Sequence, residues 1–209
     1  MPGIDLRRTA TAPQAPDVRE LQDYRLRRSD DEVTSYIGMI IFLASWAMMF
    51  AALFFAYAVM RFRAPLWPPA DQPPLPILLP TLNTVVIAAS SASVAFAVRA
   101  SAFGRRRRAF AGLSIAAVLG ASFLILQVMV WSSLWRAGLV PSSGPYGSVF
   151  YALTTFHALH VLVGLAALTA LALRERAQRT TRTAVRLWGM FWHFVGCIWL
   201  ALYLSVYLA

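Results

Sequence analysis

The chain has 209 residues, of which 59% are hydrophobic and only 13% are charged, and its mean hydropathy is +0.60. This composition excludes an ordinary soluble globular domain, in which roughly a quarter of the residues are charged. The formal net charge of +10 does not indicate a nucleic-acid partner, because the arginines lie between long apolar runs. A lipid bilayer is therefore the predicted solvent.

Residues 1–34 form a polar arm before the first apolar run. The arm holds six arginines and seven acids, together with Pro13 and Pro16. A segment with so much charge and so few apolar side chains cannot bury a core, so we expect it to be disordered. Residues 35–209 are predicted to form the membrane domain.

Five uncharged segments follow the arm, and each is long enough to cross the hydrocarbon core of a bilayer. Their approximate bounds are 36–60, 77–98, 110–135, 149–173 and 187–208. None of the charged side chains falls within them, as the cost of placing charge in lipid requires. The predicted fold class is all-α, an integral membrane bundle of five transmembrane helices.

The arginines are unequally divided between the two sides of this predicted bundle. When alternate connections are assigned to alternate sides, 16 of the 19 arginines share a side with the N-terminus and 3 lie opposite. The positive-inside rule then places the N-terminus in the cytoplasm and the C-terminus outside. The basic connections are also suited to contact with anionic lipid headgroups.

Two of the predicted helices have contrasting faces. In the second, Ala89, Ser93 and Ala97 recur every four residues, and such a row of small side chains predicts close approach of a neighbouring helix. The first helix instead has a broad bulky face, which we expect to meet lipid or a large partner surface. That face consists of Phe42, Trp46, Met49, Phe50, Leu53 and Tyr57.

Few polar side chains lie within the predicted spans, and none of them is a carboxylate. The candidates for a functional role are Asn83, Gln127, Thr154, His157, His160 and His193. Without Asp or Glu at depth, a proton-coupled transporter and a carboxylate-bridged metal site are both disfavoured.

The three histidines are open to more than one interpretation. His157 and His160 share a helical face, and with His193 and the single cysteine they could bind copper or zinc. Histidines on facing helices could also hold a haem, with Gly164 or Gly196 making room for the ring. The alternative is a structural role as neutral groups that hydrogen-bond across helices. The structural role is favoured. A histidine that binds a metal usually donates its other ring N–H to an acceptor that fixes its tautomer, and no buried acid is available for this.

The two amide side chains have simpler expected roles. A lone glutamine such as Gln127 most often bridges membrane helices. Asn83 follows Pro80 by three residues and can bond backbone groups that the proline leaves free. Both are predicted to be structural.

Taken in order, six blocks of the sequence resemble subunit III of the haem-copper cytochrome c oxidases, in its five-helix form. The blocks are "YIGMIIFLASWAMMFAALFFAYAVMR", "APLWPP", "LNTVVIAASSASVAFA", "LGASFLILQVMVW", "FYALTTFHALHVLVG" and "FWHFVGCIWLALYLSVYLA". The resemblance covers residues 36–208. It implies a non-catalytic subunit of a terminal oxidase, in which oxygen reduction and proton pumping occur in the partner subunits.

The same resemblance implies the partners and location of the chain. Oxidase subunit I is the main expected contact, with subunit II and membrane lipids as further neighbours, in the bacterial inner membrane. Bound phospholipid is expected in a cleft, whereas haem and copper belong to the partner subunits and no catalytic, cofactor-binding or metal site is expected in this chain. The residues implied to line an internal polar patch or lipid cleft are His157, His160, His193, Trp46, Gln127, Asn83 and Thr154.

Two other functions remain open at this point. One is an accessory subunit of a nitric oxide reductase. The other is a stand-alone membrane electron-transfer protein that binds haem through His157 or His160 together with His193.

This sequence departs from the family pattern at three buried acids. The family commonly has a glutamate where this chain has Trp46, often a glutamate where it has Val130, and usually an aspartate where it has Gly196. A proton-related role of the first-helix carboxylate therefore does not carry over to this chain.

Overall fold

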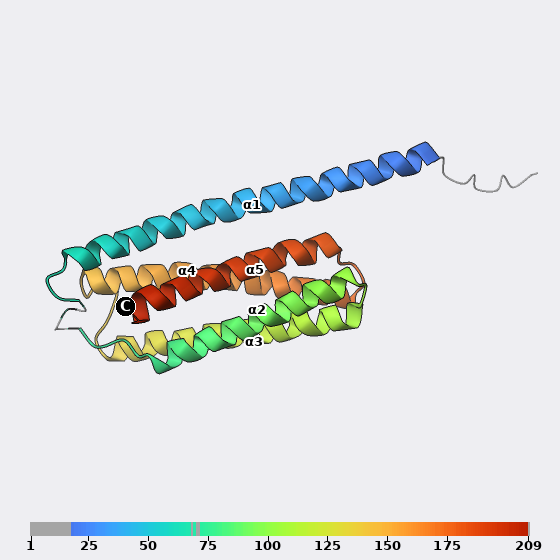
Figure 1. Ribbon diagram of the computed structural model, residues 1–209. Coiled ribbons are helices and arrows are strands. Elements are labelled where there is room, and N and C mark those ends of the chain that lie inside the picture. Colours follow the sequence, from blue (N-terminus) through green and yellow to red (C-terminus); the bar gives the residue numbers. More distant parts are fainter. Residues whose placement is uncertain (1–17, 68, 70–71, 209) are drawn as a thin grey trace, which may run out of the picture. The chain divides into compact units, whose positions relative to one another are not determined.

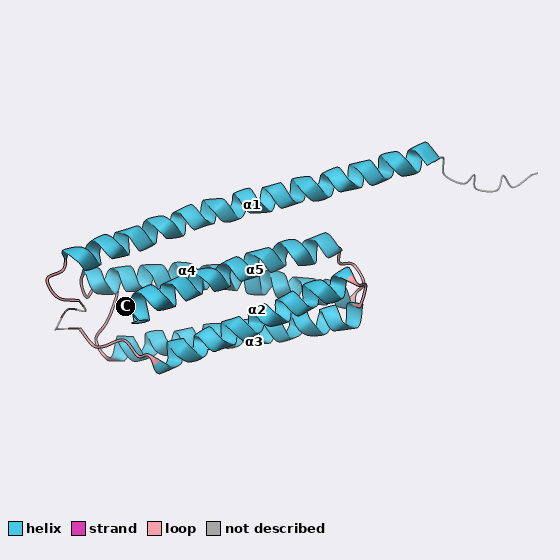
Figure 2. Cartoon of the chain, in the orientation of Figure 1, coloured by secondary structure: helices cyan, strands magenta, loops and turns pink. Residues whose placement is uncertain are grey.

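The computed structural model of the protein describes residues 18–67, 69 and 72–208. Five α-helices and a terminal π-helix account for most of these residues (Figure 1): α1 (Val18–Arg63), α2 (Leu78–Ala102), α3 (Arg106–Arg136), α4 (Pro145–Arg176), α5 (Arg182–Leu202) and η1 (Tyr203–Leu208). The described part of the chain contains no strand (Figure 2). The predicted all-α fold is confirmed.

Five described stretches are long and apolar enough to cross a membrane, in agreement with the five predicted spans. They are Asp30–Arg63, Leu78–Ala102, Arg106–Arg136, Pro145–Arg176 and Arg182–Leu208. Helices α2 and α3 each end two residues before a glycine with positive φ, Gly104 (69°) and Gly138 (93°) respectively. Glycine adopts this conformation at little steric cost, and it commonly ends helices for that reason.

The first helix begins at Val18, well before the predicted start near residue 36. Residues 18–34, which we expected to be disordered, contain no proline or glycine to interrupt a helix. Residues 1–17 of the predicted arm lie outside the described residues. The chain divides into two compact units, Met1–Ile37 and Gly38–Ala209, and the bundle described below belongs to the second.

Helices α2 to α5 form a bundle in which α2 packs on α3 and α5, and α4 packs on the same two helices (Figure 1). The backbones of α2 and α3 approach closely at Gly112, where an added Cβ would lie 2.9 Å from the Cβ of Ala97 and 3.0 Å from the carbonyl oxygen of Ser93. Ser93 and Ala97 therefore have the contact role that the sequence predicts. Ala89 does not, because it is exposed.

One side chain of α5, Trp192, joins all four helices of this bundle. An added Cβ at Gly120 of α3 or at Gly164 of α4 would lie 2.7 Å from the Trp192 indole, so the ring occupies the space that these glycines leave. The indole N–H donates a 3.1 Å hydrogen bond to the Ser90 hydroxyl of α2. That hydroxyl donates in turn to the Ala116 carbonyl of α3, at 2.9 Å. The fully buried indole is thus fixed by both shape and hydrogen bonding.

The bulky face of α1 turns toward α4 and α5. Phe50 is 1% exposed, and the rings of Phe42 and Phe191 are 6.2 Å apart. Near the end of α1, the Tyr57 hydroxyl donates a 3.0 Å hydrogen bond to the Ser205 carbonyl. The prediction that this face meets lipid or a partner is wrong for Phe50 and Tyr57, because these large side chains reach across to the neighbouring helices of the same chain.

We predict that Gly120→Ala destabilises the bundle by roughly 1–3 kcal/mol, because the new methyl group overlaps the rigid indole of Trp192. The matched control is Gly38→Ala in α1, where no heavy atom lies within 4 Å of the added Cβ. The control should be neutral or slightly stabilising. Thermal unfolding of the two purified variants checks this, and equal effects would contradict the packing described.

Candidate functional site

Two of the predicted site residues, Asn83 of α2 and Gln127 of α3, meet inside the bundle. Both are almost fully buried, at 0% and 1% exposure. The Asn83 side-chain amide donates a long hydrogen bond of 3.5 Å to the Gln127 Oε1 atom. The two amides therefore link α2 to α3, as predicted for Gln127.

The neighbouring part of α4 contributes Thr154 and His157. The indole N–H of Trp131 in α3 donates to the Thr154 hydroxyl at 3.1 Å. The His157 ring lies 5.7 Å from the ring of Phe123, also in α3. Since Phe123 and Trp131 are one turn before and one turn after Gln127, the glutamine faces this same part of α4. Asn83, Gln127, Thr154 and His157 thus belong to one internal polar cluster.

His160 lies in a different setting, against α1. Its ring centroid is 4.1 Å from that of Trp46, edge to face, and 5.1 Å from that of Phe50. Its Nδ1 hydrogen-bonds the Phe156 carbonyl of its own helix, so the cross-helix hydrogen bond expected of this histidine is replaced by ring contacts. The ring borders a small groove of about 150 Å³, lined by Phe42, Trp46, Phe156, Leu159, His160, Val163 and Phe191.

His193 is half-buried on α5 and takes part in neither set of contacts. Among the residues that the structure describes, no three His, Cys, Asp or Glu side chains lie close enough together to hold a metal ion. Gly164, considered as a place for a haem ring, is occupied by the indole of Trp192. The residues of the predicted patch therefore do not form one site. Some belong to the internal cluster, others line the small groove, and His193 belongs to neither.

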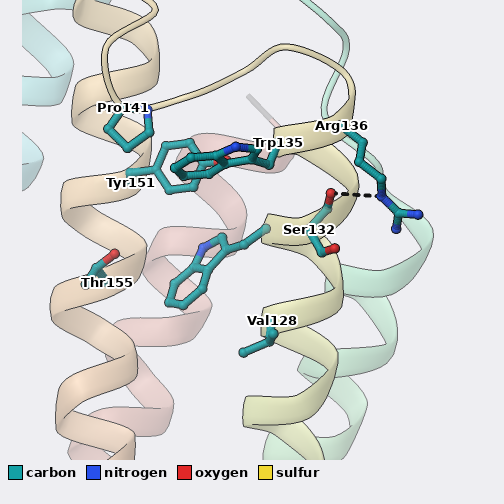
Figure 3. Close-up of a pocket in the computed structure, with 8 residues that line it drawn as sticks. Val128, Ser132, Trp135, Arg136, Pro141, Tyr151 and Thr155 are labelled. Atoms are coloured by element: carbon teal, nitrogen blue, oxygen red, sulfur yellow. Dashed lines mark hydrogen bonds between the residues drawn. The ribbon is translucent and has the colours of Figure 1, made fainter.

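A larger groove between α3 and α4, which sequence reasoning missed, has a volume of about 490 Å³ (Figure 3). It is lined by Val128, Trp131, Ser132, Trp135, Arg136, Pro141, Tyr151 and Thr155. The Trp135 and Tyr151 rings meet edge to face with centroids 6.2 Å apart. Arg136 borders the groove at the end of α3, and its Nε–H donates to the Ser132 carbonyl at 3.2 Å (Figure 3). The sequence signal that could have indicated this groove is a tryptophan followed by an arginine at the end of a span, which is typical of the membrane interface.

The resemblance leads us to expect acids at three positions, and at each of them the structure shows a contact with a neighbouring side chain or complete burial. Trp46 covers the His160 ring, and Val130 is completely buried in α3. At Gly196 an added Cβ would lie 3.2 Å from the Ser91 hydroxyl of α2. Each position is thus filled or closed by apolar packing or a neighbouring helix.

Comparison with known proteins decides the family. The sequence model of "Cytochrome c oxidase subunit III" matches residues 32–209, which include every helix of the bundle. The chain belongs to the cytochrome c oxidase subunit III family. Proteins named cytochrome c oxidase subunit 3 from Osphranter robustus, Equus caballus and Sus scrofa are each 35% identical over 179 residues, covering 81% of this chain and 67% of the relative.

With its five spans the chain is a multi-pass membrane protein. Its family places it in the respiratory chain. The family is a subunit without metal centres, and it has partner subunits in an oxidase complex. The two alternatives, a nitric oxide reductase subunit and a stand-alone haem protein, are not favoured by these matches.

We predict that His160→Ala weakens the attachment of α1 by roughly 1–3 kcal/mol, because it removes the ring that Trp46 and Phe50 contact. His160→Phe keeps an aromatic ring and serves as the matched control. The measurement is the detergent concentration at which half of the purified protein unfolds. If alanine and phenylalanine at this position have the same effect, the ring contacts are not what holds α1.

Proposed function

We propose that this chain is a non-catalytic subunit that packs beside subunit I of a haem-copper oxidase, with subunit II as a further neighbour. The observation that supports this most strongly is the family match over residues 32–209, because it includes the whole membrane bundle and not one motif. The chain's contribution is mechanical: it stabilises the catalytic subunit from the side.

The side chains on the bundle surface suit this role. Large apolar residues are exposed on α2 and α3, among them Val85, Phe96, Val118 and Ile125. Exposed apolar helix faces in a bilayer meet either lipid or the helices of a partner. The predicted spans also hold no acid that could carry protons, so pumping stays in the partner subunits.

We further propose the bacterial cytoplasmic membrane as the location, with the N-terminus inside. The support is the arginine asymmetry, 16 on the N-terminal side against 3 opposite. In this orientation the end of α3 that carries Arg136 faces outward.

Purification through an affinity tag on this chain tests the proposed complex. We expect haem-bearing subunits to purify with it in fixed ratio, and the haem absorption to stay with those subunits after mild detergent dissociation. Recovery of the chain without haem-bearing partners would contradict the proposal. So would a stoichiometric haem that remains on the isolated chain.

The phospholipid is proposed to occupy the groove between α3 and α4 (Figure 3). An acyl chain fits along the apolar side chains of Val128 and Trp131, and a phosphate fits beside Arg136. The Arg136 Nε–H is directed to Ser132, which leaves the terminal amino groups of the guanidinium for a headgroup. Trp135 and Tyr151 have the amphipathic rings that are enriched at this depth of a membrane.

We predict that Arg136→Gln weakens retention of an anionic phospholipid about fivefold, since one cation near the membrane surface contributes about 1 kcal/mol. Arg99→Gln, which removes an exposed arginine from the last turn of α2, is the matched control. Lipid bound to the delipidated complex after titration with phosphatidylglycerol is measured by mass spectrometry. Equal retention by both variants would place the lipid elsewhere while leaving the subunit assignment intact.

A further inference from the structure

Several polar atoms in the interior of the bundle have no hydrogen-bond partner among the residues that the structure describes, and one of them is His160 Nε2, beside Trp46. The others are Asn83 Oδ1, Gln127 Nε2, both ring nitrogens of His157 and the Tyr207 hydroxyl. The four residues come from α2, α3, α4 and η1, and the exposure of each is 7% or less. Buried polar atoms are nearly always hydrogen-bonded, because an unsatisfied one loses its bonds to water without replacement.

These atoms lie near one another. The Asn83 and Gln127 amides already share a long hydrogen bond of 3.5 Å. The Tyr207 hydroxyl lies close to the Gln127 amide, and neither this hydroxyl nor Gln127 Nε2 has a direct hydrogen bond of good geometry. The His157 ring lies 5.3 Å from that of Trp199, whose ring is 6.2 Å from that of Tyr207. Gln127 therefore lies beside Asn83, and His157 is connected to Tyr207 through the Trp199 ring.

The π-helical end of the chain is what brings Tyr207 into the interior. In η1 the backbone turns wider than in an α-helix, and Tyr203, Val206 and Tyr207 are all buried. π-helical turns are rare and occur frequently at functional sites. The Tyr207 ring meets the Phe150 ring edge to face, with centroids 5.9 Å apart, so packing fixes its position. Its hydroxyl has no hydrogen-bond partner in the described part of the chain.

The unpartnered atoms have complementary hydrogen-bonding character. Gln127 Nε2 can only donate, and Asn83 Oδ1 can only accept, whereas the Tyr207 hydroxyl does both. A neutral imidazole such as that of His157 offers one donor and one acceptor. A water molecule needs two to four polar partners in a buried site, and this group supplies both kinds.

We propose that the interior of the bundle holds a specific water-binding site, in which ordered water bridges Gln127, Asn83 and Tyr207 and extends to His157. The water joins η1 to α2, α3 and α4, and it supplements the long direct hydrogen bond between Asn83 and Gln127. This site differs from the grooves on the bundle surface, and the inference does not depend on the identity of the partner subunits.

Tyr207→Phe in the assembled complex separates a Tyr207 hydroxyl that is hydrogen-bonded from one that is buried without a partner. If the hydroxyl binds water, its removal breaks hydrogen bonds, and the bundle should unfold roughly three- to tenfold faster in detergent. If the hydroxyl is buried without a partner, its removal should leave the rate unchanged or slow it. Tyr203→Phe is the matched control, because the Tyr203 hydroxyl shares a direct 2.6 Å hydrogen bond with Thr81 and its loss must destabilise.

A cryo-electron microscopy map of the complex that resolves ordered water provides the second measurement. We expect density within hydrogen-bonding distance of Gln127 and the Tyr207 hydroxyl, and its loss in Tyr207→Phe. Direct side-chain hydrogen bonds among Asn83, Gln127 and Tyr207, with no density between them, would overturn the proposal. An unchanged or slower unfolding rate in Tyr207→Phe would overturn it as well.

Discussion

The insertion of Trp192 between Gly120 and Gly164 is the contact on which the rest of the bundle depends. In a bilayer, the lipid tails are as apolar as the side chains, so helices gain little from burying apolar surface against one another. Close packing and buried hydrogen bonds must hold them together instead. Trp192 supplies both, since its ring fills the space beside two glycines and its N–H donates to Ser90.

This arrangement explains why α2 to α5 and α1 are joined in different ways. The four-helix bundle is fixed by backbone approach at small residues, such as Gly112 against Ala97. The α1 residues after Ile37 instead reach the bundle through large aromatic side chains, such as Trp46 on His160. Bulky contacts of this kind leave grooves beside them, and one such groove borders the His160 ring. A rigid core with apolar grooves on its surface suits the proposed role of a subunit that supports its neighbour and holds lipid.

Much of the fold could be predicted from the sequence, because lipid imposes simple rules. Charge is excluded from the spans and arginine marks their ends, so all five helices were predicted to within a few residues, apart from the start of α1. The bridging role of Gln127 followed from the same reasoning, whereas Asn83 was expected to bond backbone groups near Pro80 and donates to Gln127 instead. The helix over residues 18–34 was not predicted, because the segment was judged by its high charge and not by its lack of proline and glycine.

The sequence could not show that the predicted site residues lie in separate places, because this depends on which helices face one another. His157 and His160 share a helical face by spacing, yet one meets Phe123 of α3 and the other meets Trp46 of α1. Gly164 was recognised as space for a ring, but the ring proved to be an indole of the same chain. The burial of Tyr207 was also not predicted, because the π-helical turn that buries it has no clear sequence signal.

A double-mutant cycle between Gly164→Ala and Trp192→Leu tests the central role of this contact most directly. Each single variant should be destabilised, the first by overlap with the indole and the second by loss of packing and of the bond to Ser90. In the double variant the overlap disappears, so its loss of unfolding free energy should be smaller than the two single losses combined by about 1 kcal/mol or more. Strictly additive losses would contradict the account, because they would show that the indole and the glycine do not share the same space.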